Sequence, residues 1–151
     1  MNPLIQRAIS MFNKARQKAD WRKGKCAILH CDPALYDMDN VAFTSGYRMH
    51  SAGIRTVPLH AIRGTLGRQH DFDQRFYPLS DRLQDRWVNI AVARLRDEPV
   101  GLVRLYLVNH CYYVEDGHHR ISVAHALGEA AIDAEIILLD SLLSRAEKEY
   151  E

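Results

Sequence analysis

The chain has 151 residues, of which 47% are hydrophobic and 26% charged, proportions that are typical of one globular domain. The 20 Lys and Arg residues nearly balance the 19 Asp and Glu residues, and the net charge of +1 does not favour a nucleic-acid partner, since duplex-binding proteins usually carry a basic excess. No apolar run approaches the ~20 residues that span a bilayer, and the start of the chain lacks the uninterrupted apolar core of a secretory signal. We therefore expect no membrane partner and a cytoplasmic location.

The three cysteines are Cys26, Cys31 and Cys111. An odd number without the Cys-x-x-Cys spacing does not favour a disulfide framework, so reduced thiols are expected. His30 lies between the first two cysteines, but a zinc ion would need a fourth ligand from elsewhere in the chain. No metal-ligand cluster is predicted.

The first predicted element is an amphipathic helix over residues 3–22, because apolar residues recur there at intervals of three and four. Its opposite face is basic and includes Lys14 and Lys18. This helix either packs on the sheet of the domain or serves as a basic lid or partner helix. The pattern is weaker over residues 23–53. We divide the single domain into an N-terminal helix with an elaboration (1–54), a core (55–140) and a helical tail (141–151).

The remaining elements alternate between strand and helix patterns, which predicts an α/β (α+β) fold. Ser80 is the expected N-cap of a helix, and Asn109-His110 the expected turn of a hairpin. The expected strands are 55–62, 103–108, 112–114 and 130–138, and the expected helices are 80–96, a short helix after residue 116, and 142–151.

The turn Asp116-Gly117-His118-His119-Arg120 opens a helix directly after an apolar, β-rich run. The glycine lets the backbone approach a ligand, and the free N–H groups at the start of a helix attract an anion. Arg120 can hold two oxygens of a phosphate or carboxylate at once. The pattern predicts an anion site with acid–base groups. The alternative is a plain helix start, in which Asp116 is the N-cap.

A second polar segment, residues 64–73, is predicted to be a glycine-rich loop that could approach a phosphate. Its candidate binding residues are Gly64, Thr65 and Arg68, and its candidate general bases or metal ligands are Asp71 and Asp73. The alternative is a polar surface turn. Arginines also cluster in this part of the chain, at positions 55, 63, 68 and 75. Such spacing is typical of a solvated face, but this group could also line a pocket for an anion.

The turn at residues 116–120, the alanine-rich helix after it, Gly128 and the strand 132–137 together resemble the ParB/sulfiredoxin superfamily. The equivalent turn reads Gly-Glu-Arg-Arg in ParB proteins and Gly-Cys-His-Arg in sulfiredoxins, whereas Asp-Gly-His-His-Arg is similar to the turn of the free serine kinases. The resemblance covers roughly residues 55–138. It implies a small mixed sheet flanked by helices, here with an N-terminal helical extension, and a nucleotide-phosphate cradle at Gly117, His118, His119 and Arg120.

The sequence also departs from these families. His118 occupies the position of the reactive cysteine of sulfiredoxins, so reduction of a sulfinic acid is not expected. His118-His119 stands where ParB proteins have Glu-Arg, which puts CTP chemistry of the ParB kind in doubt.

These features predict a ParB-like protein that binds a nucleotide or another phosphorylated small molecule, with ATP or CTP and Mg²⁺ as hypothetical cofactors. Asp116, Asp71 or Asp73 would serve as general base or metal ligand, and His118 or His119 as general acid or stabiliser of a phosphoryl oxygen. A phosphotransferase or hydrolase acting on a small molecule is one hypothesis. A non-catalytic regulatory module and a ParB-like nucleic-acid-binding or nuclease protein are the alternatives. The sequence does not predict an oligomeric state.

Overall fold

The computed structural model describes residues 2–37, 47–66 and 70–141. Its first element is the helix α1 (Pro3–Leu29), and the side chain of Asn2 caps it by accepting a hydrogen bond of 2.9 Å from the Leu4 amide. Pro3 suits the first helical position, where its missing N–H would have no partner in the helix. The helix continues well past the predicted end at residue 22 and stops at His30, whose φ of 57° is left-handed.

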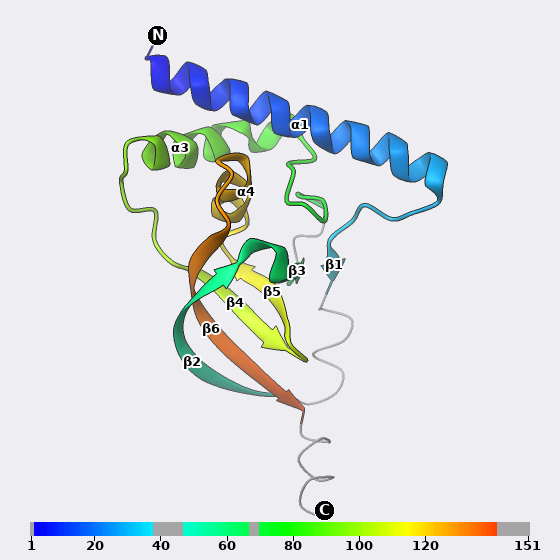
Figure 1. The fold of residues 1–151 in the computed structure, drawn as a ribbon, viewed down its shortest axis with the longest axis vertical. Coiled ribbons are helices and arrows are strands. Elements are labelled where there is room, and N and C mark those ends of the chain that lie inside the picture. Colours follow the sequence, from blue (N-terminus) through cyan, green and yellow to red (C-terminus); the bar gives the residue numbers. More distant parts are fainter. Residues whose placement is uncertain (1, 38–46, 67–69, 142–151) are drawn as a thin grey trace, which may run out of the picture.

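The sheet is mixed and has the strand order β1-β3-β5-β4-β6-β2 (Figure 1). Its central strands β4 (Val103–Val108) and β5 (Cys111–Asp116) are antiparallel, and β6 (Ala131–Ser141) runs parallel to β4. The long strand β2 (Tyr47–Pro58) pairs antiparallel with β6, while β3 (Ile62–Thr65) lies parallel between β5 and β1 (Tyr36–Asp37). The predicted α+β class with an N-terminal helix is confirmed.

The segment predicted as one strand over residues 55–62 is divided in the structure. The strand β2 ends at Pro58, the short helix η1 (Leu59–Ala61) turns the chain, and β3 begins at Ile62. The backbone amide of Leu59 donates to the carbonyl of Ala130, which holds this turn against the start of β6. Gly64 and Thr65 therefore belong to a strand and not to the predicted loop, and the predicted boundary after residue 54 falls inside β2.

The predicted hairpin is confirmed. Val108 of β4 pairs with Cys111 of β5, so Asn109 and His110 alone make the turn. Both have positive φ angles, 50° and 66°, as a type I′ turn requires.

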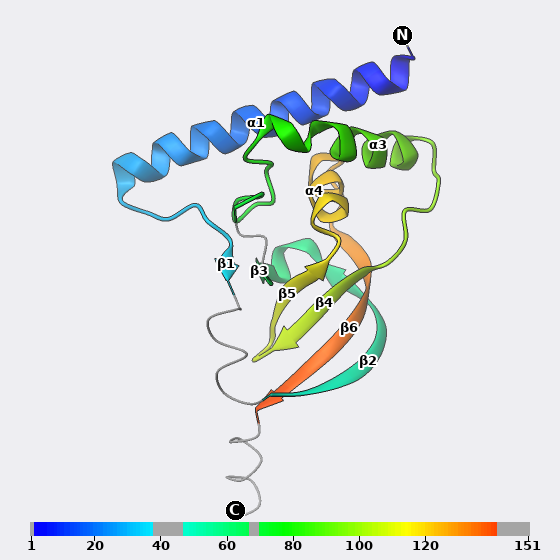
Figure 2. The same ribbon diagram turned by 180° about the vertical axis from the view of Figure 1, so that it is seen from behind.

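The helices lie to one side of the sheet, with α1 outermost (Figures 1 and 2). Ser80 caps the short helix η2 (Asp81–Leu83), which leads into α3 (Gln84–Leu95). Phe12 of α1 packs edge-on against Trp87 of α3, and the indole of Trp87 donates a hydrogen bond of 2.8 Å to Ser122 of α4 (His118–Ala126). These contacts join the helices through buried side chains.

The C-terminal half of α1 extends beyond α3 and reaches over the end of the sheet that carries β1 and β3 (Figure 1). Among the described residues, no helix is long and apolar enough to cross a membrane. The predicted tail helix at residues 142–151 lies outside the described part of the chain.

The expectation that the cysteines are reduced is wrong for Cys26 and Cys31, which form a disulfide bond. The left-handed residue His30 turns the chain back, so that the Cys31 amide donates to the Cys26 carbonyl and the two Cα atoms lie 4.6 Å apart. Spacing along the sequence gave no sign of this, because the proximity depends on how the helix ends. Cys111 is free.

Candidate anion-binding pocket

The turn at the start of α4 is packed into the protein. Gly117 has a φ of 113°, and its α-carbon lies so close to Val103 of β4 that an added Cβ would be 2.5 Å from a methyl group of that side chain. Asp116 is exposed and forms an ion pair of 3.0 Å with Arg120. Arg120 also donates a hydrogen bond of 2.6 Å to the Leu102 carbonyl. Its guanidinium therefore ties the turn to the segment before β4, where the sequence analysis expected it to hold a phosphate.

His118 and His119 are each only 4% exposed. His118 shares a hydrogen bond with the buried hydroxyl of Thr65 and stacks on Phe72, with the ring planes 17° apart. His119 meets the same phenyl ring edge-on. The predicted loop (64–73) and the predicted turn (116–120) thus meet at Thr65, Phe72 and the two histidines. These side chains pack directly against one another.

The candidate carboxylates of the 64–73 segment are paired with arginines from other elements. Asp71 pairs with Arg82 of η2. Asp73 is fully buried and lies 2.9 Å from the guanidinium of Arg22, near the end of α1. Each of these candidate carboxylates is thus engaged in an ion pair, and their roles as general base or metal ligand stay predictions. In the described residues, no group of three or more His, Cys, Asp or Glu side chains could hold a metal ion.

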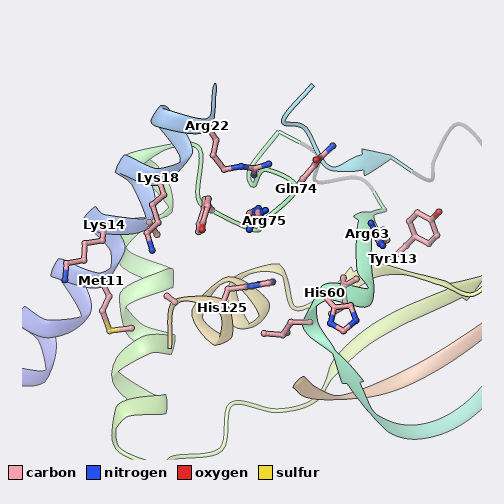
Figure 3. A pocket seen from close by; sticks show the side chains of 15 residues that line it. Met11, Lys14, Lys18, Arg22, His60, Arg63, Gln74, Arg75, Tyr113 and His125 are labelled. Atoms are coloured by element: carbon pink, nitrogen blue, oxygen red, sulfur yellow. The ribbon is translucent and has the colours of Figure 1, made fainter. Parts of the chain in front are cut away.

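A pocket of about 840 Å³ opens on another part of the molecule, between α1, the loop 74–77, η1 with β3, the middle of β5 and the end of α4 (Figure 3). Its size is typical of small-molecule sites. The described candidate residues of the 64–73 segment and of the turn at 116–120 do not line it, and Arg68 lies outside the described residues. Arg63 and Arg75, from the group of arginines that could line a pocket for an anion, do line it. The pocket is at the C-terminal end of α4, whereas the sequence pointed to the N-terminal end.

Helix α1 supplies one wall of this pocket. Lys14, Lys18 and Arg22 follow one another at intervals of four residues, which places them on the same face of the helix. The Lys18 ammonium lies 5.8 Å from the centre of the Tyr77 ring, and Arg22 is held by Asp73. The apolar face of α1 was expected to pack on the sheet, but it packs mainly on the helices α3 and α4. The basic face lines the pocket, and its role as a lid or partner helix stays a prediction.

The loop opposite α1 is organised by Asp73. Its carboxylate accepts hydrogen bonds of 2.9 Å from the Arg75 amide and 3.0 Å from the Tyr77 amide. Phe76 adopts a left-handed φ of 58° between them, and its ring is buried. This tight turn sends Gln74, Arg75 and Tyr77 into the pocket wall while Phe76 anchors the loop in the core.

The charge of the pocket is one-sided. Lys14, Lys18, Arg63 and Arg75 line it, and none of the four has a carboxylate partner in the part of the chain that the structure describes. No Asp or Glu is among the described residues that line it. A concave surface with one sign of charge concentrates its electric field, so the pocket attracts anions.

His125 forms part of the pocket floor. Its ring stacks on Phe76 with the planes 12° apart, and its Nε2 atom is buried without a hydrogen-bond partner among the described residues. Burial, together with the positive charge of Arg75, lowers the pKa of His125 below its ordinary range. The imidazole is therefore neutral at neutral pH.

Part of this site is predicted from the sequence, but not its position. Lys14 and Lys18 belong to the predicted basic face, and Arg63 and Arg75 belong to the group of arginines that could line a pocket for an anion. His60, Tyr113 and His125 are not among the predicted site residues. His125 follows His118 by seven residues on α4 and so lies on nearly the same helical face, which was the available signal.

The fold and the pocket together define a mixed α/β protein with a pocket that is lined by cationic side chains. Comparison with protein-family models, with curated proteins and with solved structures finds no match to this chain. The resemblance to the ParB/sulfiredoxin superfamily stays a hypothesis.

Proposed function

We propose that this protein binds a phosphate-bearing small molecule of nucleotide size in the pocket between α1, the loop 74–77 and the end of α4. The observation that carries the proposal is a set of four cations around a cavity of about 840 Å³, Lys14, Lys18, Arg63 and Arg75, which have no carboxylate partner among the residues that the structure describes. Lysine and arginine are the side chains that bind phosphate groups through charge-assisted hydrogen bonds.

The rest of the lining suits a ligand with an organic part. Met11, Leu59 and Ile62 contribute apolar surface, and Tyr77 and Tyr113 contribute aromatic rings. A nucleotide combines phosphates with a flat base that can stack on such rings. ATP and CTP therefore remain the ligands to test first.

The geometry supports binding more than catalysis. Each carboxylate that was a candidate for general base or Mg²⁺ ligand is paired with an arginine: Asp71 with Arg82, Asp73 with Arg22, and Asp116 with Arg120. A nucleotide-binding regulatory module is thus the form of the hypothesis that we favour over a phosphotransferase or hydrolase.

We expect isothermal titration calorimetry at low salt to show saturable binding of pyrophosphate, ATP or CTP, and Arg75→Gln to weaken it by about 10- to 150-fold. This range corresponds to about 1.5–3 kcal/mol for one hydrogen bond to a charged group. Lys18→Gln should act in the same direction.

Arg86→Gln is the matched control, because Arg86 is exposed on α3 and is not part of the pocket lining. It removes the same charge and should leave the affinity unchanged. A wild-type protein that binds none of the three ligands would refute the proposal, as would an equal loss in the control. Loss of binding in Arg120→Gln with full binding in Arg75→Gln would instead return the site to the turn at the start of α4.

A further inference from the structure

His125 is a residue of the pocket lining whose hydrogen bonding is incomplete among the described residues. It lies in the last turn of α4, and one side of its ring is covered by Phe76 at 5.9 Å between ring centres. Its buried Nε2 atom has no hydrogen-bond partner in the described part of the chain. A buried nitrogen in this state is unfavourable, and such groups in folded proteins usually mark the place of a water, an ion or a ligand.

The side chains that face His125 across the pocket are cationic or neutral. Arg75 on the loop 74–77 is the one whose charge acts on it most directly. The other charged or titratable groups of the lining are Lys14, Lys18 and Arg22 on α1, and His60 and Arg63 on η1 and β3. Tyr77 and Tyr113 complete the set from the loop and from β5, and Asp73 stands behind Arg22, paired with it.

A bound anion would change this balance. It would neutralise Arg75 and place negative charge beside a ring that, among the described residues of the lining, faces positive or uncharged groups. A positively charged imidazolium is favoured by a nearby anion and disfavoured by a nearby cation. The incomplete bonding of Nε2 also means that no existing hydrogen bond has to be broken for the ring to accept a proton.

We propose that His125 takes up one proton from solvent when an anion occupies the pocket, so that the bound ligand is held by an imidazolium as well as by Arg75 and the lysines. This inference rests on the proposed function. It adds that binding of an anionic ligand is coupled to the protonation of His125. By linkage, affinity for an anion of fixed charge rises as the pH falls through the range in which His125 titrates. The gain in affinity is about tenfold for each unit by which the pKa of His125 rises in the complex.

The test follows the His125 ring resonances by NMR over a pH series, in the free protein and at saturating inorganic sulfate. Sulfate is the probe because its own charge does not change between about pH 5.5 and 8, where histidines titrate. The resonance is assigned by its loss in His125→Gln. We expect the pKa of His125 to be below its ordinary range in the free protein and to rise by about one unit or more with sulfate bound.

Two variants separate His125 from the other histidine of the pocket. We expect His125→Gln, which keeps a polar side chain of similar length, to bind sulfate with an affinity that no longer rises as the pH falls. His60→Gln, which removes an exposed ring from the same lining, should keep the wild-type pH dependence.

A pKa of His125 that is the same with and without saturating sulfate would overturn this inference and leave the proposed function standing. The same holds if His60→Gln, and not His125→Gln, abolishes the pH dependence. Absence of binding of sulfate, pyrophosphate, ATP and CTP to the wild-type protein would overturn the proposed function, and this inference with it.

Discussion

Replacement of Gly117 by alanine is expected to destabilise the protein by about 2–6 kcal/mol. The φ of 113° is a conformation that side chains with a Cβ rarely adopt, and the new Cβ would lie 2.5 Å and 2.8 Å from the Cγ1 and Cβ atoms of Val103. Backbone strain of about 1–3 kcal/mol and overpacking of about 1–3 kcal/mol act together here. Val103 is fully buried in β4, so it cannot move aside without disturbing the core.

The measurement is urea unfolding followed by circular dichroism, with Gly24→Ala as the matched control. Gly24 lies inside α1 with nothing within 4 Å of an added Cβ. Alanine is the better helix former, so the control should gain about 0.5–1 kcal/mol. If Gly117→Ala were as stable as wild type, α4 would not be joined to β4 through this close contact.

Removal of the Asp73 carboxylate is the second large effect that we expect. Asp73→Ala should destabilise the protein by about 3–5 kcal/mol, because it leaves Arg22 without its partner and the Arg75 and Tyr77 amides without their acceptor. The carboxylate is the link between the end of α1 and the loop 74–77, which are the two walls of the pocket. We therefore expect weaker pyrophosphate binding as well as lower stability.

Asp20→Asn is the control for Asp73→Ala. Asp20 pairs with Arg16 on α1 at 3.3 Å, but its side chain is 67% exposed, and surface pairs of this kind contribute about 0–1 kcal/mol. Equal urea midpoints for Asp73→Ala and Asp20→Asn would show that the buried pair with Arg22 does not hold the pocket together.

Asp73 also gives the protein a defined dependence of stability on pH. Burial raises the pKa of its carboxyl group above the ordinary value of 3.8, although two backbone amides and Arg22 act in the opposite direction. The folded protein therefore binds more protons than the unfolded chain between the two pKa values, and the free energy of unfolding falls as the pH rises through that interval. In Asp73→Asn this component is absent. The difference in unfolding free energy between wild type and Asp73→Asn, measured in urea at a series of pH values, should change across the interval; a constant difference would contradict the argument.

Elements with strong local signals could be predicted from the sequence. Asn2 and Pro3 start α1, Ser80 caps η2, and Asn109-His110 turns the hairpin. In each case the decisive interaction is between residues a few positions apart, so the sequence contains all of it. The end of α1 could not be predicted in this way, because residues 23–29 carry no regular pattern and Gly24 weakens it further.

The kinds of residue that form the candidate site could be predicted in part from the sequence, but the place of the site in the fold could not. Asp116-Gly117-His118-His119-Arg120 has the residues of an anion site, yet Arg120 is occupied by Asp116 and the Leu102 carbonyl, and both histidines pack on Phe72. A sequence pattern does not show whether a charged side chain already has a partner. The partners come from other elements, and they decide which cations are left for a ligand.

The sequence by itself determined the class of fold, the start of α1, the cap of η2, the tight hairpin and the presence of a basic face on α1. Only the tertiary structure decided that this face meets Arg63, Arg75 and His125 around one pocket, and that Asp73 is paired with Arg22 behind it. The physical reason is the separation along the chain of the residues that interact. Caps and turns are fixed by hydrogen bonds within a few residues, whereas the charge and shape of a pocket depend on side chains that packing brings together from distant parts of the chain.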